Sequence, residues 1–261
     1  MLVVDESFCQ DLVLYKGKKV SVIVPAHNEA RFIEDVVRTV PYFVDFIIAV
    51  DDCSTDSTLA KLSRITDKRL RIVHHTRRSG VGAAIMSGHR AAMRLGSDVN
   101  VVMAGDGQMD PASLPALLEP LVTGKYDFSK GNRFSRISSL RGMPPLRVVG
   151  NIILTLLTQI ATGYWRISDS QNGYTAINTN VLRHIYLTHM SDGYLFENDL
   201  LIRLAKHSCR IVDIPIPTRY VGRESKIKLT SYVLEASVFL LRSILSRYYH
   251  ANHSAFARTK P

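Results

Sequence analysis

An apolar run that ends in a carboxylate and an amide is the most informative feature of this sequence. Residues Val99–Ala104 are almost all apolar, which predicts a buried strand, and Gly105 ends it. Asp106 and Gln108 follow on the loop at the carboxyl end, where open α/β sheets bind ligands. Their oxygens are hard ligands that suit Mg²⁺ or Mn²⁺, and such a cation commonly neutralises a diphosphate. Taken alone, these residues also fit a polar turn between a strand and a helix.

Two further polar clusters follow apolar runs. Pro25–Glu29 follows the first apolar run of the chain, and Asp51 and Asp52 follow the second. Because the carboxyl ends of parallel strands meet at one edge of a sheet, we expect all three clusters to face the same edge. The alternatives are a helix-capping role for Glu29 and a simple turn for the two aspartates.

Strands and helices that could position these clusters alternate through the first half. Strands are expected at Val20–Val24, Phe46–Val50, Leu70–His74 and Val99–Ala104, and helices at Ala30–Val40, after Ser57, at Gly82–Leu95 and at Ser113–Val122. This alternation predicts a mostly parallel sheet with helices on both faces, an α/β fold. In the less regular second half, strands are expected near Phe128–Lys130 and Arg210–Ile214, and helices at Leu146–Gly163, Glu197–Lys206 and Tyr232–Tyr249.

Composition narrows the functional classes. The 261 residues are 46% hydrophobic, enough for one large core or two small ones, and the net charge of +10 favours anionic partners. No run of five basic residues occurs and the expected ligand edge is acidic, which argues against nucleic acid. Three scattered cysteines predict neither a disulfide framework nor a zinc site and fit a reducing cytosol. The first residues lack the pattern of a signal peptide.

The final helix is expected to be amphipathic. Its apolar residues are Val233, Leu234, Val238, Leu240, Leu241, Ile244 and Leu245, and its polar face carries Glu235, Arg242, Ser243, Ser246 and Arg247. Such a helix fits a membrane interface or packing on the globular domain equally well, and Leu146–Gly163 allows the same two interpretations. Polar residues interrupt both segments, so no full transmembrane span is expected.

From about Val20 to Leu229 the chain resembles family 2 inverting glycosyltransferases of the GT-A (Rossmann-like) fold. It is most similar to the dolichyl-phosphate mannose synthase and polyprenyl-phosphate glycosyltransferase branch. The motifs that carry the resemblance occur in the family's order: VSVIVPAHNE, AVDDCSTDST, RRSGVGAA, MAGDGQMDP, GNRF, DSQNGY, GYLFEND and YVGRESK. One such motif would be weak evidence, whereas the ordered set is specific.

The resemblance implies a metal-dependent transfer of a sugar from a nucleotide-diphosphate sugar to a polyprenyl or dolichyl phosphate. GDP-mannose is the first expectation for the donor and a UDP-sugar the second, with Mg²⁺ or Mn²⁺ as cofactor. Residues 1–228 would form the GT-A domain, with a nucleotide-sugar half (1–125) and an acceptor half (126–228), and 229–261 the amphipathic helix and basic tail. The alternatives are a transferase with a soluble saccharide acceptor and a non-catalytic nucleotide-sugar-binding subunit.

A lipid-linked acceptor implies a peripheral protein at the cytoplasmic face of a membrane. The membrane surface is then a partner, and the resemblance leaves room for a membrane-embedded partner subunit. In this setting a basic residue near an anionic leaflet adds on the order of 1 kcal/mol to binding.

Motif matches also imply roles for individual residues. They imply nucleotide-sugar binding by Pro25, His27, Glu29, Val50, Asp51, Asp52, Gly82, Ala104, Asp106, Arg219, Arg223 and Lys226. They imply acceptor binding by Arg133, Arg147, Ser170, Gln171 and Asn172, metal binding by Asp106 and Gln108, and catalysis by Asp106, Asp199 and Arg133. A phosphate acceptor is already ionised, so Asp199 is expected to orient the acceptor more than to deprotonate it.

Two positions depart from the family pattern. His27 stands where the family often has tyrosine, which affects a stacking contact with the base. Ala104 replaces the first aspartate of the metal motif. The second departure is expected to weaken a ribose or metal contact and to leave Asp106 and Gln108 as direct ligands.

Overall fold

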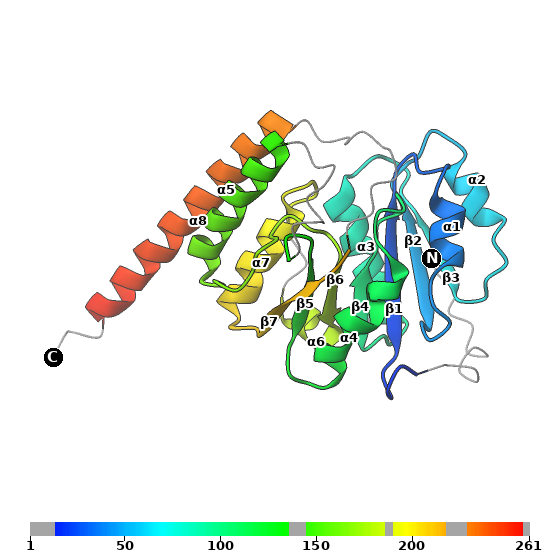
Figure 1. Cartoon of the computed structure of the whole chain (residues 1–261), viewed down its shortest axis with the longest axis horizontal. Helices are drawn as coiled ribbons and strands as arrows, with labels where there is room; N and C mark the ends of the chain where they lie inside the picture. Colours follow the sequence, from blue (N-terminus) through cyan, green and yellow to red (C-terminus); the bar gives the residue numbers. More distant parts are fainter. Residues whose placement is uncertain (1–13, 136–144, 186–189, 218–228, 258–261) are drawn as a thin grey trace.

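The computed structural model of the chain describes residues 14–135, 145–185, 190–217 and 229–257, which form a sheet flanked by helices (Figure 1). The strands are β1 (Val20–Ala26), β2 (Phe46–Asp51), β3 (Leu70–His74), β4 (Val99–Val102), β5 (Phe128–Asn132), β6 (Thr175–Asn178) and β7 (Ile211–Pro215). The helices are α1 (Ile33–Arg38), α2 (Thr58–Ser63), α3 (Val81–Arg94), the 3₁₀ turn η2 (Pro111–Ser113), α4 (Leu114–Val122), α5 (Pro145–Thr162), α6 (Thr179–His184), α7 (Phe196–Lys206) and α8 (Leu229–Ala257).

The seven strands lie in the order β3-β2-β1-β4-β6-β5-β7. All neighbouring pairs are parallel except those of β6, which runs antiparallel to β4 and to β5. Alternate residues of β1 enter different apolar clusters: Val22 and Val24 pack with α1 and α4, whereas Ile23 packs with α3. The expected mostly parallel sheet with helices on both faces is therefore confirmed.

The expected elements of the first half are present with small shifts at their ends. β3 has the expected bounds, whereas β1 continues two residues further, through Pro25. A proline is tolerated there because pairing with β4 ends at Ile23↔Val102, so no ladder hydrogen bond needs the missing N–H. Two adjacent elements in the second half, β6 and α6, were not predicted.

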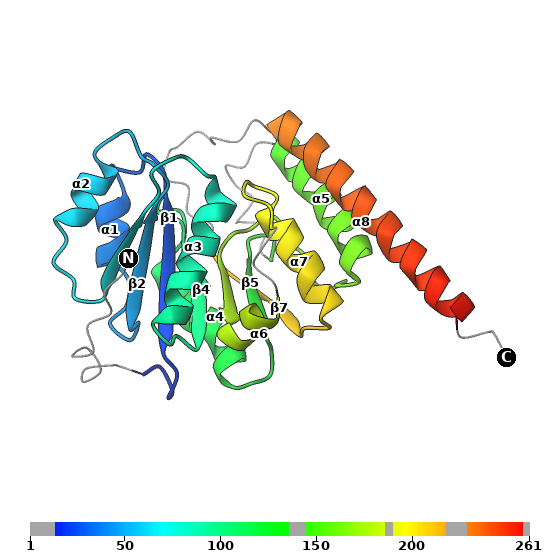
Figure 2. The ribbon, with the colours of Figure 1, turned by 180° about the vertical axis from the view of Figure 1, so that it is seen from behind.

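Helices α5 and α8 pack side by side at one end of the molecule, and α8 continues beyond α5 (Figures 1 and 2). The expected apolar face of α8 is divided between two environments. Leu240 is fully buried against α5, whereas Leu234 and Leu245 are 68% and 69% exposed. Arg247, expected on the polar face, donates hydrogen bonds to the carbonyl groups of Ile160 and Ala161 near the end of α5. In the described part of the chain, no helix has the length and apolar character to cross a bilayer.

Candidate active site

The loops that follow β1, β2 and β4 are joined by backbone hydrogen bonds at the carboxyl edge of the sheet. The N–H of Asp52 donates to the carbonyl oxygen of Ala26 (2.8 Å), and the N–H of Gly105 donates to that of Pro25 (3.1 Å). Val50 is the register partner of Pro25. The structure thus brings together the three polar clusters expected from the sequence, at the edge where parallel sheets bind ligands.

The loop after β1 is closed against the loop after β2. Asn28 has a φ of +56°, a left-handed conformation that asparagine tolerates, and its side-chain oxygen accepts from the N–H of Thr55 (2.8 Å). The N–H of Glu29, a buried residue, donates to the hydroxyl of Thr58 (2.8 Å). His27 lies alongside, with Nδ1 2.9 Å from the carbonyl oxygen of Asp52. These bonds give the edge a fixed shape.

Asp51, the last residue of β2, and Asp52, which follows it, are both buried and differ in how their oxygens are used. Asp51 accepts from Nδ1 of His74 (2.9 Å) through one oxygen, and its other oxygen has no hydrogen-bond partner. Asp52 accepts from Nδ1 of His75 and from the N–H groups of Ser79 and Gly80, each at 2.8 Å. Burial acts to raise the pKa of Asp52, but these hydrogen bonds outweigh it and hold that pKa below its usual range. Asp52 is therefore a fixed carboxylate.

The glycine-containing loop before α3 packs against backbone from the other half of the chain. A Cβ atom on Gly82 would lie 2.3 Å from the carbonyl oxygen of Ser191, and one on Gly80 would lie 2.4 Å from that of Asp192. Gly80 also has a φ of +98°, which glycine adopts without strain. Both glycines are thus required for the close approach of this loop to the backbone of residues 191–192, and this packing role does not depend on a substrate.

The loop after β4 presents the expected metal ligands. Asp106 and Gln108 are both partly exposed, and one carboxylate oxygen of Asp106 accepts from the N–H of Gln108 (3.1 Å) across Gly107, whose φ is +74°. The N–H of Ala104 donates to the sulfur of Met109 (3.1 Å). No group of three or more His, Cys, Asp or Glu side chains among the described residues could hold a metal ion. Two hard oxygen donors nevertheless fit Mg²⁺ or Mn²⁺, which complete their coordination with water and phosphate oxygens.

In the acceptor half, Arg133 forms a bidentate ion pair with Asp169. Its Nε lies 2.7 Å from one carboxylate oxygen and Nη2 lies 2.9 Å from the other. The backbone N–H of residue 133 donates to the same carboxylate (3.0 Å), which is fully buried. The pair fixes the direction of the guanidinium group at the end of β5.

The loop 170–172 is attached to its surroundings by its side chains. Ser170 lies 3.1 Å from the hydroxyl of Thr155 on α5, and Gln171 donates to Asn198 on α7 (3.1 Å). The amide of Asn172 donates to the carbonyl oxygen of Gly131 (2.7 Å). These three side chains have partners within the protein, so contact with an acceptor remains a prediction for each.

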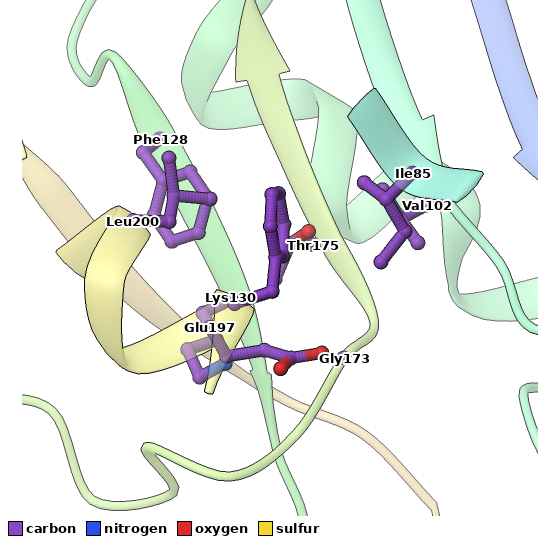
Figure 3. A pocket seen from close by; sticks show the side chains of 9 residues that line it. Ile85, Val102, Phe128, Lys130, Gly173, Thr175, Glu197 and Leu200 are labelled. Carbon is purple, nitrogen blue, oxygen red and sulfur yellow. The ribbon is translucent and has the colours of Figure 1, made fainter. Parts of the chain in front are cut away.

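Two carboxylates on α7 point to different places. Asp199 accepts from Nε of Arg203 (2.9 Å) and from the N–H of Ser191 (3.0 Å). Glu197 lines a small cavity of about 10 Å³ together with Lys130 and Gly173 (Figure 3). Lys130 is 1% exposed and donates to the carbonyl oxygen of Asn172. Burial lowers the pKa of Lys130 and raises that of Glu197, and the charge of each group opposes the shift of the other.

Several expected contacts fall outside this description. Arg219, Arg223 and Lys226 lie outside the described residues, and so does the side chain of Arg147, although residue 147 is within α5. Conversely, Asp169, Lys130 and His75 were not among the expected site residues. Asp169 adjoins the expected loop 170–172, but nothing in the sequence indicates that its partner is 36 residues away.

Residues 21–186 match the model of the family described as glycosyl transferase family 2. The chain belongs to glycosyltransferase family 2. Among the curated relatives of this glycosyltransferase is the UDP-N-acetylglucosamine–dolichyl-phosphate N-acetylglucosaminyltransferase of Methanococcus voltae, 28% identical over 78% of this chain and 86% of the relative. Another is the undecaprenyl-phosphate mannosyltransferase of Micrococcus luteus, 32% identical over 79% of this chain and 85% of the relative.

Solved structures of GT-A glycosyltransferases share the fold. The glucosyl-3-phosphoglycerate synthase of Mycobacterium tuberculosis, solved with Mn²⁺, UDP and phosphoglyceric acid, has a TM-score of 0.65. It is 22% identical in sequence, and the match covers 88% of this chain and 78% of that chain. This likeness establishes the architecture of the glycosyltransferase as GT-A.

Proposed function

We propose that this glycosyltransferase transfers a sugar from a nucleotide-diphosphate sugar to the phosphate of a polyprenyl or dolichyl phosphate. The observation that carries the proposal is the convergence of the loops after β1, β2 and β4 at one sheet edge, the edge at which β5 also ends with the fixed guanidinium of Arg133. Relatives that match about three quarters of this chain are named for lipid-phosphate acceptors. The net charge of +10 suits two phosphorylated substrates.

In the proposed reaction the acceptor phosphate oxygen forms a bond to the anomeric carbon. The bond from that carbon to the donor diphosphate breaks, and its electron pair leaves with the nucleoside diphosphate, which inverts the configuration. Asp106 and Gln108 would hold Mg²⁺ or Mn²⁺, which supplies stabilisation of the leaving charge. Arg133, with Arg147, would hold the acceptor phosphate, because a guanidinium group suits phosphate oxygens. Because the phosphate needs no base, Asp199 would position its surroundings.

The nucleotide would lie over the edge formed by Pro25, His27, Glu29, Val50, Asp51 and Asp52, with Gly82 and Ala104 at its borders. Asp52 uses three acceptor positions within the protein and offers a further one to a base N–H. Arg219, Arg223 and Lys226 are proposed to contact the diphosphate from sequence alone. GDP-mannose is the first donor to test and UDP-sugars the second.

The test is a donor panel with Mn²⁺ or Mg²⁺ and a short polyprenyl phosphate, analysed for a sugar–lipid product. We expect Asp106→Asn to abolish turnover at limiting metal, because it removes the only charged metal ligand of the loop after β4. Asp110→Asn is the matched control, because it alters another carboxylate of the same loop. The Asp110 side chain accepts a hydrogen bond from the N–H of Ala112, and the amide oxygen of asparagine can accept the same bond.

Three outcomes would contradict parts of the proposal. If Asp106→Asn keeps most of the activity at limiting metal, the metal assignment is wrong. Product with a soluble saccharide, but none with polyprenyl phosphate, would assign the other acceptor class. Donor binding without any turnover would indicate a non-catalytic subunit, with Ala104 as its disabling substitution.

We also propose that the exposed apolar residues of α5 and α8 contact a membrane surface, at its cytoplasmic face. These residues are Leu146, Val149, Ile152, Ile153 and Leu156 of α5 and Leu234, Val238, Leu241 and Leu245 of α8, each at least 40% exposed. An apolar strip on helices is typical of interfacial binding. Substituting both Leu234 and Leu245 with glutamate is expected to release the protein from protein-free liposomes, whereas Tyr42→Glu, at an 80% exposed site elsewhere, is the control. Unchanged sedimentation of the double variant would place the membrane contact elsewhere on the chain, whereas a wild-type protein that does not bind protein-free liposomes would favour a membrane-embedded partner subunit.

A further inference from the structure

His75 connects the buried carboxylate of Asp52 to helix α3. Its Nδ1 lies 2.8 Å from Asp52 Oδ1, and its Nε2 lies 2.9 Å from the hydroxyl oxygen of Ser87. The side chain of His75 is 14% exposed, and that of Asp52 is 4% exposed. The order Ser87–His75–Asp52 therefore forms a continuous hydrogen-bonded chain from the middle of α3 to the end of β2.

The direction of each bond in this chain follows from its acceptor. An ionised carboxylate only accepts hydrogen bonds, so Nδ1 of His75 must carry the proton that points to Asp52. In the neutral ring Nε2 is then an acceptor, and the Ser87 hydroxyl donates to it. The Asp52 carboxylate thus fixes the tautomer of the ring, and the bond to Ser87 holds the orientation of the ring from its other side.

This bond also decides which part of Asp52 is left for a ligand. Oδ1 accepts from His75 and from the N–H of Ser79, which fills both of its acceptor positions. Oδ2 accepts from the N–H of Gly80 and has one position left. With His75 in place, the only available acceptor of the carboxylate lies on Oδ2.

We infer that His75 is a positioning residue that sets donor affinity, by holding Asp52 with one Oδ2 lone pair directed to the nucleotide base. The inference rests on the proposed function, since it takes Asp52 as part of the nucleotide pocket. Without the Nδ1 hydrogen bond, Oδ1 has a vacant acceptor position and the carboxylate can rotate. A base N–H then meets a carboxylate of variable orientation, and binding weakens with little effect on the transfer step.

Substituting His75 with asparagine or with glutamine tests its two hydrogen bonds, to Asp52 and to Ser87, one at a time. The side-chain amide of asparagine lies where Nδ1 of histidine lies and can still donate to Asp52, whereas the longer glutamine places its amide nearer to Ser87. A groove of about 360 Å³ borders His75, Ser79 and Ser87, so neither side chain meets a closed wall. His184→Gln is the control, because His184 is exposed and, among the described residues, its side chain bonds the carbonyl oxygen of Asn180 within its own helix, α6.

The experiment measures equilibrium binding of GDP and of UDP, each with Mn²⁺, and then the steady-state constants for the preferred donor. We expect His75→Gln to weaken nucleotide binding and to raise the donor KM by roughly tenfold or more, the effect of one hydrogen bond to a charged group, with kcat largely kept. His75→Asn is expected to keep binding to within about threefold of wild type, a smaller loss than that of His75→Gln, because one hydrogen bond to Asp52 is retained.

Equal weakening by His75→Asn and His75→Gln would overturn the inference, because a packing role does not distinguish the two amides. Wild-type affinity in His75→Gln would overturn it as well. In both cases a wild-type protein that still binds nucleotide leaves the proposed function intact. A wild-type protein that binds neither nucleotide would overturn both.

Discussion

Replacing Arg133 with methionine is expected to cost about 3–5 kcal/mol of unfolding free energy, the usual cost of breaking a buried ion pair by removing one partner. The reason lies in Asp169, which is fully buried and accepts two charged hydrogen bonds from Arg133, at 2.7 Å and 2.9 Å. After the substitution, the only bond that remains from residue 133 to this carboxylate is its backbone N–H. The variant therefore leaves a buried carboxylate without its bidentate partner, and the charge of Lys130, which interacts with Asp169, compensates it only in part.

The effect of Asp169→Asn on stability is then expected to differ between the wild-type protein and the Arg133→Met variant. In the wild-type protein this substitution removes a charge-assisted pair and is expected to destabilise by about 1.5–3 kcal/mol. In Arg133→Met it removes the unpaired charge and is expected to stabilise, because an amide oxygen can still accept from the backbone N–H. The same substitution thus changes sign between the two backgrounds.

The assay is urea denaturation of the four proteins followed by far-UV circular dichroism, which gives the coupling energy from a double-mutant cycle. Arg133→Lys keeps the charge but cannot form two parallel bonds, so we expect a smaller loss than with methionine and a higher KM for the acceptor. If Asp169→Asn destabilises both backgrounds equally, the two side chains do not interact energetically and this reasoning is refuted.

Two further predictions concern stability. Gly82→Ala places a Cβ atom 2.3 Å from the carbonyl oxygen of Ser191 and is expected to cost about 1–3 kcal/mol in urea denaturation, whereas Gly193→Ala, with no atom within 4 Å, is the matched control. Burial lowers the pKa of His89 to about 3, whereas the pKa in the unfolded chain is about 6.5. The free energy of unfolding is therefore unaffected by His89 above about pH 6.5 and falls as the pH drops below that value, because only the unfolded chain binds the proton. From about pH 7 to about pH 5, wild type is expected to lose about 2 kcal/mol more than His89→Leu, and equal losses would contradict a neutral buried imidazole.

Much of the fold was predictable from local patterns, because each strand of the first half is a short apolar run with a clear end. Strand β6 gave no such signal. Thr175–Asn178 is four residues long, only Ala176 and Ile177 are apolar, and α6 follows at once. Its place between β4 and β5 depends on pairing with Asn100 and Ser129, and therefore on contacts distant in sequence. An antiparallel strand in the middle of a parallel sheet cannot be inferred from strand–helix alternation.

The candidate site divides in the same way. The clusters around Asp52 and Asp106 were expected to meet because the carboxyl ends of parallel strands share an edge, which is a consequence of topology. The hydrogen-bond partners of Asp52 and Asp106 do not follow from the topology of the sheet. His75 directly follows β3, and nothing in the sequence around it indicates that it lies between Asp52 and Ser87. Hydrogen-bond partners of this kind depend on side-chain directions, which sequence spacing does not give.

Helix α7 shows why residue type and position were insufficient to choose a reacting carboxylate. Glu197 and Asp199 are two residues apart, and with 3.6 residues per turn they leave the helix on nearly opposite sides. Asp199 is paired with Arg203, whereas a Cβ atom on Gly173 would lie 3.2 Å from a carboxylate oxygen of Glu197 and 3.6 Å from the terminal methyl of Met109. Met109 directly follows Gln108, so Glu197 is the α7 carboxylate on the side of the expected metal loop. The direction in which each side chain leaves α7, and not its type or its spacing along the sequence, therefore decides which carboxylate lies near that loop.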